Sequence, residues 1–240
     1  TDKPGAGWHL RQIDPAKWPA VRVVGKFGAA PWGKIKLDEL FLPPTPYLRG
    51  KFFIEKPLRS ATLYVTGLGI FDVHCNGRRV SDDLFSPGWT DYNKRVYCRA
   101  YDITPLLQRG ENVLGAILAD GWYCGYVGHK GQRAYYGPHP SFLLQLHVTC
   151  ADGSTTILTS DAAWRGAPGP IVYSDLLHGE YYDARRAVPG WNTPQFDDRD
   201  WQPVIVEDGY PLTLEARSAP PVRVVETLPP VRVHTLAPQT

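Results

Sequence analysis

Short segments with a β-type pattern fill most of the chain after residue 46. Residues 59–67 (RSATLYVTG) alternate, with Ala61, Leu63 and Val65 on one side and polar or aromatic residues on the other. This period of two is typical of a strand that buries one face. The other predicted strands are rich in β-branched and aromatic residues: 47–54, 70–75, 95–103, 113–118, 141–150 and 155–159. The chain is therefore expected to be all-β, apart from a short helical turn at 104–107.

Turn signals separate these strands at short intervals. Asn76-Gly77 and Asp152-Gly153 are pairs typical of tight hairpins, because glycine tolerates the positive φ angles that such turns need. The 23 glycines, 23 prolines, eight tryptophans and thirteen tyrosines also fit many short strands joined by turns. Short antiparallel strands over residues 47–206 predict a jelly-roll β-sandwich of the galactose-binding-like kind.

Proline-rich segments predict the domain boundaries. Within residues 1–46 tryptophans lie among prolines and glycines, and the run 42–46 (LPPTP) cannot join a β-ladder. Residues 1–46 are expected to be the tail of an upstream domain or an arm packed on the next one. Residues 207–240 repeat a proline-bounded VRV pattern, which predicts a linker and the first strand of a following domain. The chain begins with Thr1, and it is expected to be a segment of something longer.

Charge and composition exclude several classes of function. The net charge is +2 and both signs are mixed along the chain, so nucleic acid is not an expected partner. No apolar run is long enough to span a membrane. The cysteines form no CxxC pair, which argues against zinc, and they could be disulfide-bonded or free; free thiols are the favoured interpretation. They are Cys75, Cys98, Cys124 and Cys150.

The most informative segment is 111–137, a predicted buried strand followed by a long loop that begins at Gly121. A loop of this length in a compact domain is usually either functional or disordered. Aromatic residues in such a loop can stack on a sugar ring or pack beneath the loop, and the residues alone leave both readings open. The aromatic residues of the loop are Trp122, Tyr123, Tyr126, Tyr135 and Tyr136.

Several separate phrases resemble one family, in the same order along the chain. They are LYVTGLGIFDVHCNGRRVSDDLFSPGWTDYNKRVY (63–97), LADGWYCG (118–125), SDLLHGEYYDARR (174–186) and PGWNTPQFDDRDWQPV (189–204). Together they resemble the N-terminal β-sandwich module of bacterial α-L-rhamnosidases of glycoside hydrolase family 78. Residues 18–34 resemble the end of a sugar-binding domain that precedes this module in large members, and residues 218–233 resemble the entry to the β-domain that follows.

The resemblance implies a non-catalytic module. In that family an inverting (α/α)₆ barrel further downstream carries the catalytic carboxylates, and nothing in this chain resembles that barrel. Some modules bind terminal L-rhamnose with help from a calcium ion, whereas others only pack against the barrel. The expected partners are thus a rhamnose-containing glycan and the barrel of the same protein. The residues leave the localisation open, and a secreted or periplasmic location is expected only by analogy with polysaccharide-degrading enzymes.

Two loops carry side-chain oxygens that could bind calcium and a sugar, and they are expected to lie near each other. Asp91 and Asn93 lie in the first loop, with Asp82 and Asp83, and Asp120 begins the second. Calcium prefers carboxylate, amide and carbonyl oxygens, so Asp91, Asn93 and Asp120 are the candidate metal ligands. The alternative is that these residues only cap turns. The candidate sugar-binding residues are these three together with Trp122, Tyr123, Tyr126, His129 and Tyr136.

Two further features are expected to be structural. Trp89 follows Pro87-Gly88 and is predicted to be a core residue. Glu180 and Asp183 could be read as the general acid and base of a glycosidase, but beside Arg185 they are expected to form an ion-paired knot. Three hypotheses follow: a carbohydrate-binding module, a structural module that shapes the active-site rim of the barrel, and, least favoured, a fragment that is itself a hydrolase.

Overall fold

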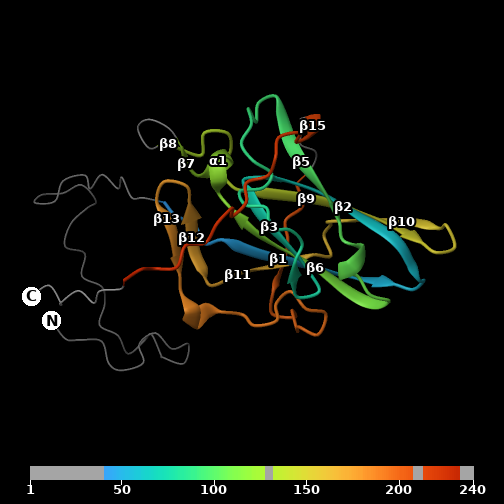
Figure 1. Cartoon of the computed structure of the whole chain (residues 1–240). Helices are drawn as coiled ribbons and strands as arrows, with labels where there is room; N and C mark the ends of the chain where they lie inside the picture. The colour runs from blue at the N-terminus through green and yellow to red at the C-terminus, as the bar shows by residue number, and fades with distance from the viewer. Residues whose placement is uncertain (1–40, 128–131, 208–212, 233–240) are drawn as a thin grey trace, which may run out of the picture. The chain divides into compact units, whose positions relative to one another are not determined.

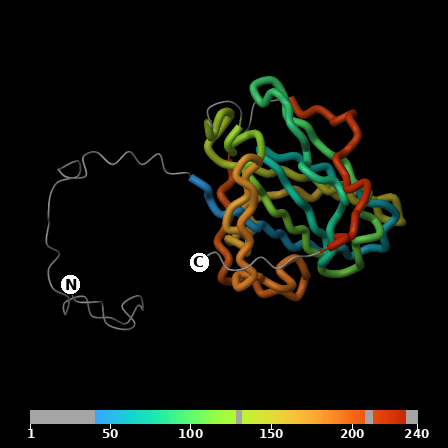
Figure 2. The backbone as a smooth tube through the Cα atoms, turned by 60° about the vertical axis from the view of Figure 1, so that its left-hand side comes forward, coloured from blue at the N-terminus to red at the C-terminus, as the bar shows by residue number. Residues whose placement is uncertain are grey.

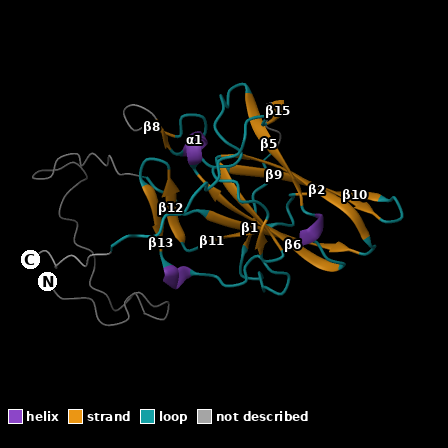
Figure 3. Cartoon of the chain, in the orientation of Figure 1, coloured by secondary structure: helices purple, strands orange, loops and turns teal. Residues whose placement is uncertain are grey.

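The computed structural model describes residues 41–127, 132–207 and 213–232 (Figure 1). From Leu42 onward the described residues belong to one compact unit. The predicted segment 1–46 lies almost entirely outside the described residues. Strands and loops make up nearly all of the described chain, with three short helical turns (Figure 3). These turns are η2 (Thr104–Leu106), α1 (Gly121–Cys124) and η3 (Ala184–Arg186).

Two main sheets form the two layers of the molecule, as Figures 1 and 2 show from different sides. The six-stranded sheet has the order β14 (Gln202–Pro203), β11 (Arg165–Pro168), β1 (Pro46–Ile54), β6 (Gly110–Ala119), β3 (Ile70–Cys75) and β4 (Arg78–Arg79). The five-stranded sheet has the order β10 (Thr155–Thr159), β9 (Ser141–Cys150), β2 (Leu58–Leu68), β5 (Arg95–Asp102) and β15 (Thr213–Ala216). Two small hairpins complete the fold: β7 (Tyr126–Val127) with β8 (Gln132–Arg133), and β12 (Ile171–Asp175) with β13 (Gly179–Tyr182).

The core lies between the two sheets and follows the predicted alternation. Leu63 and Val65 of β2 are buried with apolar residues of the facing sheet, such as Val73 and Leu118. Every pair within the described sheets is antiparallel except β5 with β15. The all-β, antiparallel sandwich is thus confirmed, whereas its jelly-roll connectivity stays a prediction.

Described residues after 206 contact the sandwich, and the assignment of 207–240 to a linker and the first strand of a following domain stays a prediction. β15 pairs with β5, and the Leu84 amide donates to the Val222 carbonyl at 2.8 Å. Arg223 forms ion pairs with Asp82 and Asp83. The edge of β5 was open to pairing, and the prolines beside Val222 limit it to a single bridge, so this stretch lies on the sandwich itself.

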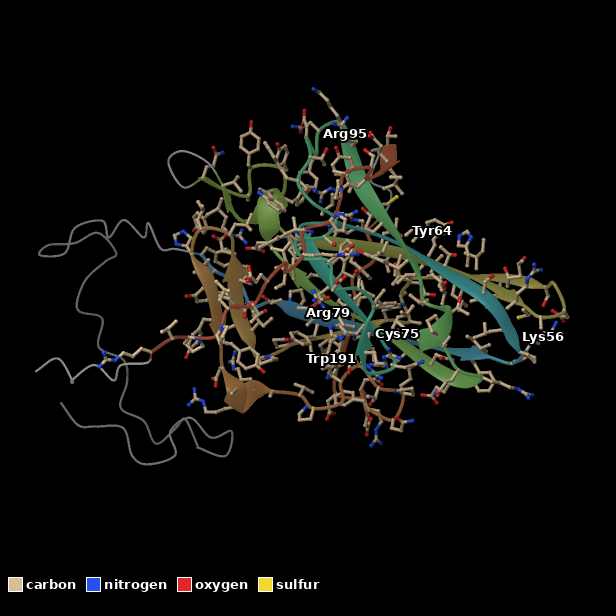
Figure 4. The ribbon with its side chains drawn as sticks, viewed as in Figure 1. Lys56, Tyr64, Cys75, Arg79, Arg95 and Trp191 are labelled. Carbon is tan, nitrogen blue, oxygen red and sulfur yellow. The ribbon has the colours of Figure 1, made fainter. Side chains whose placement is uncertain are left out.

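A buried arginine fastens the segment 189–204 to the six-stranded sheet. Arg49 of β1 is 1% exposed and forms an ion pair with Asp198. Its second terminal nitrogen donates to the Thr193 carbonyl at 2.9 Å. Trp191 of the same segment packs edge-on against Tyr47 of β1, with ring centroids 4.9 Å apart (Figure 4 labels Trp191). A segment whose only described strand is the two-residue β14 is therefore also held to the sheet by one charge pair and one aromatic cluster.

All four cysteines are free, so the favoured interpretation of free thiols is confirmed. Cys75, Cys124 and Cys150 are buried, and Cys98 is only partly covered. Burial raises the pKa of the Cys75 thiol to about 12, so its reactive thiolate is scarce at neutral pH. Along the described residues, no helix has the length and apolar character needed to cross a bilayer.

A thiol reagent is expected to modify Cys98 first in the native chain. The other three thiols are expected to react only on the timescale of unfolding, because the reagent cannot reach them in the folded state. Absorbance with a disulfide reagent, in buffer and then in denaturant, measures both phases. Rapid modification of two or more thiols in buffer would contradict this expectation, and Cys98→Ser supplies the control that removes the fast phase.

Candidate functional site

The two predicted loops meet at one end of the sandwich, as the sequence led us to expect. Tyr92 of the first loop packs edge-on against Tyr123 of α1, with ring centroids 5.2 Å apart. Phe85 and Trp122 form a second aromatic pair between the loops, at 6.2 Å. Leu68 of β2 lies in the same cluster, beneath Tyr92 and Tyr123. This cluster packs residues from separate parts of the chain together beneath the two loops.

Asp120 anchors the second loop from the inside. Its Oδ2 accepts a hydrogen bond from Arg133 Nη2 at 2.6 Å, and both side chains are largely buried. Its Oδ1 lies 3.3 Å from the sulfur of Cys124, which donates to it. Gly121 follows with φ 54°, and an added Cβ there would press against Ile70, so glycine suits this turn. The carboxylate therefore links the start of the loop to its return strand.

Asp91 caps a turn in the first loop. Its Oδ1 accepts from the backbone amide of Asn93 at 3.1 Å, and its Oδ2 lies 3.2 Å from Lys94 Nζ. The Asn93 amide and the Lys94 ammonium lower the pKa of Asp91, the backbone hydrogen bond contributing most. This is the turn-capping arrangement that the sequence left open as the alternative.

The side chains at these positions do not form a ready set of calcium ligands. Asp91 and Asp120 are each engaged by a cation of their own, Lys94 and Arg133 respectively. Among the residues that the structure describes, no group of three or more His, Cys, Asp or Glu side chains could hold a metal ion. Calcium can also take amide and backbone carbonyl oxygens as ligands, so a calcium site formed by Asp91, Asn93 and Asp120 stays a prediction.

The aromatic residues of the second loop divide into an inner and an outer set. Tyr123 is 5% exposed and packs in the cluster, and Tyr136 stacks parallel to it with centroids 6.4 Å apart. Trp122 is half-buried beside Phe85, and Tyr135 is exposed. The candidates Tyr123 and Tyr136 thus support the loop, whereas Trp122 stays accessible. His129, another candidate, lies outside the described residues.

The prediction that Trp89 belongs to the core is wrong, because its side chain is 63% exposed. Tyr92, three residues later, takes the core position instead and is almost fully buried. The backbone turns at Gly88, which has φ 102° and lies against Arg217, and this turn leaves Trp89 facing solvent. Sequence reasoning also missed Phe85, an exposed aromatic residue at φ 55°, because no local pattern marks a positive φ at a phenylalanine.

The hairpin β12–β13 is tied to the aromatic loop. The buried carboxylate of Asp175 accepts from the Tyr126 amide at 2.7 Å and from the amides of Leu177 and His178 at 2.9 and 3.0 Å. The rings of Tyr126 and His178 lie 4.8 Å apart. Figures 1 and 2 both show the orange hairpin beside the yellow-green loop. The candidate Tyr126 thus stands where loop and hairpin join, and Asp175 is a positioning residue that the sequence did not reveal.

The acid pair of the hairpin separates into two different environments. Both oxygens of Asp183 accept hydrogen bonds from Arg185, at 2.8 Å each. These hydrogen bonds lower the pKa of Asp183 to about 2. Glu180 is exposed on β13 and has no ion pair among the described residues. The ion-paired interpretation is therefore confirmed for Asp183, which Arg185 holds, whereas Glu180 lies outside that pair.

The fold and the two loops define a class: a β-sandwich module with an aromatic surface at one end. The chain belongs to the family described as "Alpha-L-rhamnosidase N-terminal domain", whose sequence profile matches residues 56–226. The α-L-rhamnosidase of Streptomyces avermitilis is 43% identical over 233 residues, which cover 96% of this chain and 22% of that enzyme.

Solved structures support the same assignment. The S. avermitilis α-L-rhamnosidase complexed with L-rhamnose matches 94% of this chain and 22% of its own chain, with a TM-score of 0.75 and 42% identity. The α-L-rhamnosidase of Dictyoglumus thermophilum matches 79% of this chain and 20% of its own, with a TM-score of 0.72 and 34% identity. The chain thus spans about a fifth of the length of these relatives, so it corresponds to one part of such an enzyme.

Proposed function

We propose that this chain is a non-catalytic carbohydrate-binding module of an α-L-rhamnosidase, and that it binds terminal L-rhamnose or a related 6-deoxy sugar. Hydrolysis by the whole protein would take place in a part that this chain does not include. The chain matches only about a fifth of the length of each relative, which supports a catalytic part elsewhere in the protein. The relative solved with L-rhamnose supports the choice of sugar.

The exposed aromatic edge of the two loops carries the proposal. Phe85, Trp89 and Trp122 present ring surface to solvent although the loops beneath them are well packed. Aromatic rings match the apolar face of a sugar and the methyl group of a 6-deoxy sugar. Phe85 also adopts a left-handed backbone conformation, which costs about 1–3 kcal/mol for such a residue and is typical of functional sites.

Polar side chains of the same loops can form hydrogen bonds with the sugar hydroxyls. The Asp91 side chain is 40% exposed, whereas that of Asp120 is 7% exposed. A sugar hydroxyl can therefore reach Asp91 and its neighbour Asn93, and Asp120 acts by holding the loop in place. This division refines the candidate set: Asp91, Asn93, Trp122 and Tyr126 contact the sugar, and Asp120, Tyr123 and Tyr136 support them.

Titration of the chain with L-rhamnose is expected to release a measurable heat of binding. Trp122→Ala is expected to weaken binding about fivefold, because one stacked ring contributes roughly 1 kcal/mol. Tyr182→Ala, an exposed tyrosine on β13, is the matched control and should leave the affinity unchanged. The titration is run with calcium chloride and with a chelator. An absence of heat in both conditions would contradict the proposal, and heat only with calcium would show a metal site completed by the sugar.

The second candidate function is a structural one, and the partly inward position of the loop aromatic residues favours it. The inward position of Tyr123 and Tyr136 favours a structural module that packs on the catalytic barrel and shapes its active-site rim. The hairpin adds exposed apolar side chains at Leu177 and Tyr181 that another part of the protein could cover. This hypothesis predicts no binding of free sugar. It also predicts that Tyr123→Ala lowers the stability or activity of a full-length enzyme.

The least favoured hypothesis, that residues 1–240 hydrolyse rhamnosides themselves, predicts turnover of an aryl α-L-rhamnoside. The pairing of Asp183 with Arg185 argues against it, because both carboxylate oxygens accept hydrogen bonds from the guanidinium and are not free to take part in catalysis.

A further inference from the structure

The outer face of the five-stranded sheet carries an exposed aromatic residue between neutral neighbours. Leu63 and Val65 of β2 point into the core, so Tyr64 between them points outward, and it is 42% exposed. The strand register places Tyr64 opposite Gln145 of β9 on one side and opposite Ala100 of β5 on the other. Figure 4 shows Tyr64 on the side of this sheet that faces away from the core residue Cys75.

The Tyr64 ring is held in place by its neighbours on β9. The His147 ring packs against it edge to face, with centroids 5.0 Å apart and an interplanar angle of 67°. The Nε2 atom of His147 lies 3.3 Å from the side-chain oxygen of Gln145, within hydrogen-bond distance. An oriented ring with an imidazole and a primary amide beside it offers both a stacking surface and hydrogen-bonding groups. These are the two kinds of contact that a sugar ring requires.

The charge of this face matches an uncharged ligand. The register partners of Tyr64 are Ala100 and Gln145, and those of His147 are Thr62 and Ile157, so none of them carries a charge. These residues, with Leu143, form an outer strip, and Asp102, opposite Thr62, lies at its far end. The remaining side chains of the strip are neutral, and two of them, Leu143 and Ile157, are exposed and apolar. In a chain with 21% charged residues, such a strip is suited to neutral sugars and not to a uronate polymer or a nucleic acid.

The strip continues from the aromatic loops. Leu68 and Val96 lie on the same side of the sheet as Tyr64 by strand alternation, and the loop residues Tyr92 and Tyr123 cover them. Leu68 lies four positions after Tyr64 on β2, which is roughly 13 Å along the strand. A single sugar at the loop edge cannot reach Tyr64, whereas a short oligosaccharide that leaves the loops along the sheet can.

We propose that the outer sheet face around Tyr64, Gln145 and His147 is a second carbohydrate subsite, which takes neutral sugar units further along the glycan whose end lies at the loops. The inference rests on the proposed function. It adds that affinity grows with glycan length, and that Tyr64 contributes only to ligands longer than one sugar.

The test compares L-rhamnose with a linear oligorhamnoside of four units, by calorimetric titration of the chain and of single variants. We expect the four-unit probe to bind more tightly than rhamnose. Tyr64→Ala should weaken the four-unit probe about fivefold and leave rhamnose unchanged, since one stacking contact is lost. Gln145→Ala should give a smaller loss of the same kind. Tyr182→Ala, which removes a tyrosine of similar exposure from the hairpin, should change neither probe.

The outcomes separate this inference from the proposed function. If rhamnose and the four-unit probe bind equally well, and Tyr64→Ala changes neither, the second subsite is overturned while the loop site stands. If neither probe binds, both proposals fail. An equal loss of both probes in Tyr64→Ala would show an effect on the fold and would also overturn the subsite. The melting temperature of each variant is measured alongside, because an exposed tyrosine should cost little stability.

Discussion

Arg49→Met is expected to lower the free energy of unfolding by about 3–5 kcal/mol, the usual cost of breaking a buried ion pair. Arg49 is 1% exposed, and its loss leaves the Asp198 carboxylate and the Thr193 carbonyl without their donor. The segment around Trp191 should then detach from the six-stranded sheet at lower denaturant concentration. Urea unfolding, followed by tryptophan fluorescence, measures the change.

A matched control lies in the same segment. Arg199 forms an ion pair with Asp197, but both side chains are exposed, so Arg199→Met should leave the unfolding midpoint unchanged. The double variant Arg49→Met with Asp198→Asn should recover part of the loss, because the uncompensated buried charge is removed. If Arg49→Met and Arg199→Met unfold at the same midpoint, Arg49 does not fasten the segment.

The second large effect is expected at the base of the aromatic loop. Asp120→Asn should lower the free energy of unfolding by about 3 kcal/mol. The substitution leaves the largely buried guanidinium of Arg133 without its counter-charge. The substitution should also weaken rhamnose binding. Trp122 lies in α1, which directly follows Asp120, so a loosened Asp120 would shift the Trp122 ring. Urea unfolding and calorimetric titration of the same variant measure the two effects.

Asp91→Asn is the control, since this carboxylate is partly exposed and caps a local turn. It should leave the unfolding midpoint nearly unchanged while it weakens sugar binding. Thermal melts with a chelator and with calcium distinguish the anchor role from a metal role. The Arg133 ion pair predicts that the native chain melts at the same temperature in both, and a clear rise with calcium would instead assign Asp120 to a metal site.

Much of the fold followed from local pattern. The segments 70–75, 141–150 and 155–159 were predicted as strands and are strands within the same bounds. The strand predicted at 59–67 extends by one residue at each end. Alternation is a local property, because successive side chains of an extended chain face opposite ways and one face must be buried. The strand β15 could not be found in this way, since its four residues are all exposed and only the open edge of β5 makes it a strand.

The sequence predicted only part of the candidate site. The meeting of the two loops was predicted and is confirmed by the contacts of Tyr92 with Tyr123 and of Phe85 with Trp122. The direction of each side chain was not predictable. Trp89 was predicted to be in the core, but Tyr92 is buried there and Trp89 is exposed. In an irregular loop no period relates sequence position to burial, so positive φ angles at Phe85 and Gly88 decide which ring faces solvent.

The sequence by itself determined the all-β class, most strand positions, the two loops that carry the aromatic residues, and membership of the rhamnosidase module family. The tertiary structure alone decided the partners of the charged residues: Arg133 for Asp120, Asp198 for Arg49 and the Tyr126 amide for Asp175. Alternation already placed Tyr64 on the side opposite Leu63 and Val65, and the structure adds that its side chain is 42% exposed. The physical reason is range, since strand patterning depends on neighbours two residues away, whereas Arg49 and Asp198 are 149 residues apart and meet only after the sheets have formed.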